Sequence, residues 1–67
     1  MMTLYSTNCP QCRILEAKLD QMHFQYTIDE DVERMKAKGF TSAPILEVDG
    51  VAMNFKESVE WLKNYAN

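Results

Sequence analysis

The chain is poor in the residues that define several common protein classes. Among its 67 residues are two cysteines, two prolines, two glycines and one histidine. Two cysteines allow at most one intramolecular disulfide, which excludes the multiply cross-linked scaffold of small secreted domains. There is no signal-peptide pattern, and no apolar run approaches the roughly 18 residues of a membrane span. We therefore expect a cytoplasmic protein that does not enter the membrane.

Positive charge is also scarce. Seven Lys and Arg residues face ten Asp and Glu residues, so the formal net charge is −3. Nonspecific nucleic-acid binding needs a basic face, and we expect no nucleic-acid partner. A chain of this length buries only about 60% of the surface that its unfolded form exposes. We expect a single domain over residues 1–67, acting as a monomer.

The apolar pattern predicts four strands and three helices. Strands are expected at residues 3–5, 24–28, 44–48 and 51–53. Helices are expected at 10–22, from an Asp29 cap to 38, and from 55 onward. The apolar positions of the first two helices are Ile14, Leu15, Leu19 and Met22, then Val32 and Met35. The order is β-α-β-α-β-β-α, with the first two strands parallel and the second helix alone on one sheet face.

Several turn and cap residues fix the ends of these elements. Pro10 suits a first helical position, where a missing N–H costs nothing. Gly39 can supply the left-handed residue that ends the second helix. Asp49-Gly50 is a strong signal for a two-residue hairpin. Asn54 and Glu57, three residues apart, form a capping box for the last helix.

Cys9 and Cys12 follow the first expected strand and open the first expected helix. Two thiols with this spacing can close into a small disulfide and reopen. Unpaired N–H groups and the positive end of the helix favour the thiolate form of the first cysteine. The thiolate is the nucleophile of thiol–disulfide exchange. The pair therefore indicates a redox protein.

Three segments resemble the glutaredoxin branch of the thioredoxin-like fold. They are the CPxC loop Cys9-Pro10-Gln11-Cys12, the segment Ser42-Ala43-Pro44, and the strand and turn Ile45-Leu46-Glu47-Val48-Asp49-Gly50. Together with the element order, the resemblance covers essentially the whole chain. It implies an α/β thioredoxin-like fold, with a four-stranded mixed sheet flanked by three helices.

The family implies a role for each matching residue. Cys9 would attack a substrate disulfide, and Cys12 would resolve the mixed disulfide. Pro44, in the cis form, would hold the backbone of Ala43 beside Cys9 for hydrogen bonds to the substrate. Asn54 and Phe55 align with the family's Gly-Gly segment, which contacts the substrate before the last helix.

The sequence departs from glutathione-using glutaredoxins at three places. Residues 6–8 and 40–41 contain no cation, although the family usually has one near each position. Gln11 stands where the family commonly has an aromatic residue. The CxQC pair and the absence of the Gly-Gly at Asn54-Phe55 resemble NrdH-type redoxins, which take electrons from thioredoxin reductase. The aromatic signature of NrdH proteins near the last helix is absent too, so the sequence lies between the two groups. We expect no bound cofactor, with glutathione or a thioredoxin-reductase-type donor as the electron source.

The resemblance implies a disulfide-containing substrate. This is a protein disulfide, such as that of ribonucleotide reductase, or a glutathione mixed disulfide. Two other classes stay open. The cysteine pair could supply half of a metal or iron–sulfur site in a dimer, because zinc prefers four ligands and only His23 remains as a soft donor. A noncatalytic module could use the groove between Cys9 and Pro44 to hold a peptide.

Overall fold

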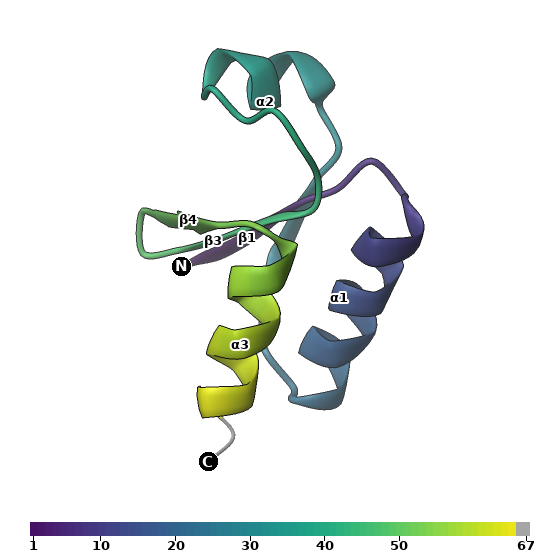
Figure 1. Ribbon diagram of the computed structural model, residues 1–67, viewed down its shortest axis with the longest axis vertical. Helices are drawn as coiled ribbons and strands as arrows, with labels where there is room; N and C mark the ends of the chain where they lie inside the picture. Colours follow the sequence, from purple (N-terminus) through teal and green to yellow (C-terminus); the bar gives the residue numbers. More distant parts are fainter. Residues whose placement is uncertain (66–67) are drawn as a thin grey trace.

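The computed structural model describes residues 1–65 of the chain and shows a mixed sheet flanked by helices (Figure 1). Its elements, in chain order, are β1 (Met2–Tyr5), α1 (Pro10–Gln21), β2 (Thr27–Asp29), α2 (Val32–Ala37), β3 (Ile45–Val48), β4 (Val51–Met53) and α3 (Phe55–Tyr65). The predicted element order is confirmed. So is the coarse fold class, an α/β domain with a four-stranded mixed sheet and three helices.

The strands lie in the order β2-β1-β3-β4. β1 is central and pairs with two neighbours. Its Leu4 lies opposite Ile28 in the parallel neighbour β2 and opposite Leu46 in the antiparallel neighbour β3. β4 then pairs antiparallel with β3. The parallel pair and the antiparallel hairpin both agree with the sequence prediction.

The helices divide between the two faces of the sheet, with α1 and α3 on one face and α2 on the other (Figure 1). Successive strand residues point to opposite faces, so each central strand contributes to two cores. The larger core joins β1, β3, α1 and α3 and contains Leu4, Leu15, Leu19, Leu46 and Leu62. The smaller core lies under α2 and contains Tyr5, Met35 and Ile45, with Phe40 packed against it.

The predicted turn and cap residues adopt the expected conformations. Asp49 and Gly50 both have positive φ, at 50° and 85°, as a type I′ hairpin requires. Gly39 has a φ of 85° and follows the C-cap of α2. Asn54 Oδ1 accepts the N–H of Glu57 at 2.8 Å, and a Glu57 carboxylate oxygen accepts the N–H of Asn54 at 3.0 Å. This is the reciprocal capping box.

The second strand is shorter than predicted. Phe24 and Tyr26 precede β2 and pack against the larger core instead. The N–H of Phe24 donates to the Leu19 carbonyl at 3.1 Å, and His23 is left-handed with a φ of 59°. Residues 23 and 24 are thus tied to the end of α1, and the strand begins only at Thr27.

The second helix begins later than predicted, and its cap is Asp31 rather than Asp29. Asp31 accepts the N–H of Arg34 at 3.2 Å, as an N-cap does. Asp29 belongs to β2, and its carboxylate accepts the Asp31 N–H at 3.0 Å and an Arg34 guanidinium N–H at 2.8 Å. Asp29 therefore lies outside α2 but stabilises the start of this helix through these two hydrogen bonds.

Two predicted core residues are exposed. Ile14 and Val32 have 47% and 46% of their surface exposed. Leu15, Leu19 and Cys12 define the buried side of α1, and Ile14 lies about 100° around the helix from Leu15. Within the described residues, no helix combines the length and apolar character needed to cross a membrane.

Ile45 and Ile28 provide a matched test of this burial pattern. Ile45 is 7% exposed, and Ile45→Val should lower the free energy of unfolding by about 0.5–1.5 kcal/mol. Ile28 is 42% exposed, and the same substitution there should change it by less than about 0.5 kcal/mol. Urea unfolding followed by circular dichroism measures both changes. Equal losses would contradict the assignment of Ile45 to a packed core.

Candidate active site

Cys9 is the N-cap of α1. Its backbone is extended, with φ −75° and ψ 165°, and its sulfur accepts the N–H of Cys12 at 3.1 Å. Its carbonyl accepts the N–H of Arg13 at 3.1 Å. Pro10 occupies the first turn of the helix, as predicted. The sulfur therefore takes the place that a Ser, Thr, Asp or Asn side-chain oxygen usually takes at a helix start.

The turn between β1 and Cys9 is fixed by local hydrogen bonds. Ser6 is fully buried, and its N–H donates to the Asp29 carbonyl at 3.0 Å. Its hydroxyl accepts the N–H of Asn8 at 3.1 Å. Asn8 is left-handed, with a φ of 62°, and its side-chain amide donates to the Glu30 carboxylate. The turn that aims Cys9 is thus anchored to the end of β2.

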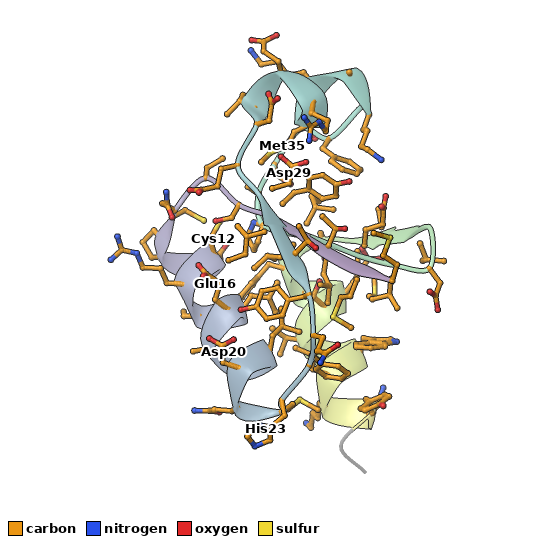
Figure 2. All side chains as sticks on the ribbon, turned by 180° about the vertical axis from the view of Figure 1, so that it is seen from behind. Cys12, Glu16, Asp20, His23, Asp29 and Met35 are labelled. Atoms are coloured by element: carbon orange, nitrogen blue, oxygen red, sulfur yellow. The ribbon has the colours of Figure 1, made fainter. Side chains whose placement is uncertain are left out.

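The two cysteines, both free thiols, differ in accessibility. Cys9 is partly exposed, whereas Cys12 has none of its surface exposed. Figure 2 shows Cys12 near the start of α1 and His23 beyond the far end of the helix. The only histidine therefore lies away from the pair. A molecule in solution can therefore contact Cys9 but not Cys12.

The buried sulfur of Cys12 is well supplied with hydrogen bonds. Burial raises the pKa of the Cys12 thiol, but several hydrogen bonds, led by those from the Cys9 side chain and the Thr7 backbone, together lower that pKa by more. The Thr7 N–H lies 3.5 Å from the Cys12 sulfur. Contributions from the Ser6 side chain and the Cys9 backbone act in the same direction. The pKa of Cys12 thus lies below its ordinary value of 9.0.

Hydrogen bonds within the pair stabilise a negative charge on either sulfur. When Cys12 carries the charge, the Cys9 side chain donates a hydrogen bond to it. When Cys9 carries the charge, its sulfur accepts the N–H of Cys12. Of the two cysteines, Cys9 is the one that is partly exposed.

The Ala43-Pro44 segment lies beside Cys9, as the resemblance implied. The peptide bond between the two residues is cis, and Pro44 is buried. Sheet register explains the placement. Tyr5 pairs with Ile45 at the end of the antiparallel ladder, so the chain leaving β1 and the chain entering β3 lie at the same sheet edge. The Ala43 carbonyl oxygen is 3.9 Å from the Cys9 sulfur.

The other predicted site residues are less closely joined. Gln11 is exposed on the first turn of α1. Asn54 and Phe55 lie at the start of α3, where Asn54 is engaged in the capping box. No hydrogen bond found within residues 1–65 links either of them to the Cys9 loop. The structure therefore brings together Cys9, Cys12, Ala43 and Pro44, while Asn54 is engaged in the cap of α3.

Sequence reasoning missed two contributors to the site. One is Thr7, whose backbone N–H reaches the Cys12 sulfur. A backbone donor leaves no mark on residue type, so no sequence signal could have found it. The other is Glu30, which holds the Asn8 side chain. Its place near the first turn follows from the parallel pairing of β1 and β2, which the element order did predict.

Metal-binding side chains do not gather here. Within the described part of the chain, no group of three or more His, Cys, Asp or Glu side chains is placed to hold a metal ion. Comparisons with protein-family models, with curated proteins and with solved structures gave no match.

Alkylation tests the difference in accessibility. Iodoacetamide added to the reduced native protein at neutral pH should label Cys9 before Cys12, because only the sulfur of Cys9 reaches solvent. Peptide mass mapping at successive times distinguishes the two sites. In urea, both cysteines should react at similar rates, which controls for intrinsic reactivity. Earlier labelling of Cys12 in the native protein would reverse the two assigned roles.

Proposed function

We propose that this protein is a small thiol–disulfide oxidoreductase of glutaredoxin or NrdH type, with a thioredoxin-like fold. One observation carries the proposal. A partly exposed Cys9 sulfur caps α1, and a buried Cys12 thiol lies three residues further along the same helix. The cis Ala43-Pro44 segment beside Cys9 supports it, since the family uses this segment to hold substrate backbone.

In the first step, the Cys9 thiolate attacks one sulfur of a substrate disulfide. A mixed disulfide forms between Cys9 and that sulfur, and the second substrate sulfur leaves as a thiolate that takes a proton. The N–H of Cys12 and the positive end of α1 stabilise the attacking thiolate. The backbone of Ala43 lies within reach of a substrate chain bound at Cys9.

In the second step, Cys12 attacks the sulfur of Cys9 and releases the substrate as a dithiol. The Thr7 N–H, 3.5 Å from the Cys12 sulfur, stabilises the Cys12 thiolate for this attack. The substrate has then gained two electrons, and the protein holds a Cys9–Cys12 disulfide. An external reductant, glutathione or a thioredoxin-reductase-type donor, restores the two thiols.

The surroundings of Cys9 favour the thioredoxin-reductase-type donor. Glutathione carries two carboxylates, and glutaredoxins usually meet one of them with cations flanking the active site. The Ser6–Asn8 turn contains no cation here, and the side chain of Asn8 is bonded to the carboxylate of Glu30. Action on protein disulfides fits this arrangement.

The two alternatives, a metal or cluster carrier and a peptide-binding module, predict different behaviour of the cysteines. A metal or cluster carrier would need donors from a second copy, which would show as dimerisation and metal content in freshly purified protein. A noncatalytic peptide-binding module would bind its partner equally well after Cys9→Ser. The proximity of the Cys12 N–H to the Cys9 sulfur favours exchange chemistry, because a peptide module has no need of a stabilised thiolate.

Two single-cysteine variants test the proposed roles. Cys12→Ser should accumulate a covalent mixed disulfide with substrate through Cys9, because the resolving thiol is absent. Cys9→Ser should lose the reduction of insulin or hydroxyethyl disulfide. Nonreducing electrophoresis and intact mass measure the first outcome, and the turnover rate measures the second. Undiminished turnover by the Cys9→Ser protein would remove the nucleophile assignment.

The electron donor is tested by running the same assay with two regenerating systems. Turnover should be faster with thioredoxin reductase and NADPH than with glutathione, glutathione reductase and NADPH. The physical reason is the missing pair of cations that would bind a glutathione carboxylate. A known glutathione-dependent glutaredoxin provides the control for the second system. Efficient turnover with the glutathione system alone would contradict the preference.

A further inference from the structure

An exposed apolar residue lies beside the active-site loop. Ile14 is 47% exposed, although it belongs to the first helix and its neighbour Leu15 is fully buried. Ile14 and Pro10 line a surface hollow of about 520 Å³, together with Asn8 and Arg13. Single exposed apolar residues are common and need no explanation. An apolar hollow that also contains a cation is less ordinary.

The residues that line the hollow flank Cys9 in the chain, although Cys9 itself does not line it. Asn8 and Pro10, which line it, are the two residues on either side of Cys9 in the chain. Arg13 and Ile14 follow one turn further along α1. A substrate chain whose sulfur approaches Cys9 would therefore place its neighbouring side chains within reach of the hollow.

Charge distinguishes this hollow from another of similar size on the α2 side. That second hollow contains Arg34, which is already paired with Asp29 at 2.8 Å and with Asp31 at 3.4 Å. Among residues 1–65, the ion pairs that the structure forms do not include Arg13. In a chain of net charge −3, Arg13 offers an uncommitted positive charge beside the reactive cysteine.

We propose that this hollow, lined by Pro10, Arg13 and Ile14, selects protein disulfides in which an apolar side chain and a carboxylate flank the attacked cysteine. The apolar side chain would contact Ile14 and Pro10, and the carboxylate would face Arg13. Glutathione offers carboxylates but no apolar side chain, so the lining fits a polypeptide better. This inference rests on the proposed function, and it specifies the substrate of that same site.

The test uses short synthetic peptides, each closed by one disulfide. Three versions differ in the two residues placed on each side of both cysteines, which are Leu and Glu, Leu and Lys, or Ala and Glu. Because both sides carry the same residues, the direction in which the peptide docks does not matter. Exchange converts the reduced protein and the peptide disulfide into the Cys9–Cys12 disulfide and a peptide dithiol. Single-turnover rates are measured at low and high salt. Glutathione mixed disulfide and hydroxyethyl disulfide serve as further substrates.

The protein variants are matched in charge. Arg13→Glu reverses the charge in the hollow, and Lys63→Glu makes the same change in the last turn of α3, at the opposite end of that helix from its sheet-side start (Figure 1). Ile14→Thr keeps a branched side chain and removes apolar surface. All of these positions are exposed or line the hollow, and circular dichroism verifies folding.

The native protein and Lys63→Glu should reduce the Leu-Glu peptide roughly two- to fivefold faster than the Leu-Lys peptide, a range typical of one exposed ion pair. Added salt should shrink this ratio. Arg13→Glu should reverse the preference. Ile14→Thr should remove the advantage of the Leu-Glu peptide over the Ala-Glu peptide.

Three results would overturn the inference. Equal ratios in the native, Arg13→Glu and Lys63→Glu proteins would show that Arg13 selects nothing. Faster reduction of glutathione mixed disulfide, slowed specifically by Arg13→Glu, would assign the hollow to glutathione. Failure of every protein to reduce even hydroxyethyl disulfide would remove the proposed function itself, and the inference with it.

Discussion

The hydrogen bond from the Cys12 N–H to the Cys9 sulfur is the interaction on which the site depends. At 3.1 Å, it makes a thiol the N-cap of a 12-residue helix. The cap orients the sulfur, and the helix end favours negative charge on it. The same bond requires Cys12 to lie in the first turn, where burial keeps it from solvent. Cys12 also lies on the buried side of α1 with Leu15 and Leu19, so packing of the helix shields its sulfur while Cys9 stays partly exposed.

The sheet brings the second half of the site to this cap. β1 and β3 are the central strands, and both are anchored by leucines of the larger core. Their antiparallel register ends at Tyr5 and Ile45, so the loop carrying Cys9 and the segment carrying Pro44 emerge together. Core packing on both faces therefore determines the distance between the reactive sulfur and the Ala43 backbone. In this way the domain keeps two segments that are far apart in the chain close together in space.

Local sequence signals predicted the fold where one or two residues determine a conformation. Asp49-Gly50, Gly39, and Asn54 with Glu57 all behaved as their chemistry requires. Prediction was less accurate where tertiary packing decides which of two neighbouring residues is buried. Ile14 and Leu15 are equally apolar, and only the position of the sheet determines that Leu15 is buried. The cysteine pair was evident from its spacing, whereas the Thr7 and Glu30 contacts depend on how β1, β2 and the turn meet.

The central claim is that Cys9 and Cys12 form a reversible redox couple, and a redox titration tests it most directly. The protein would be equilibrated in buffers of defined thiol–disulfide ratio, and its free thiols would then be blocked with an alkylating agent. Mass spectrometry would give the number of thiols blocked. The account predicts one intramolecular disulfide, with a midpoint potential of about −200 to −270 mV, the range of glutaredoxins and thioredoxin. Two thiols that stay reduced across the titration, or that form only intermolecular disulfides, would contradict it.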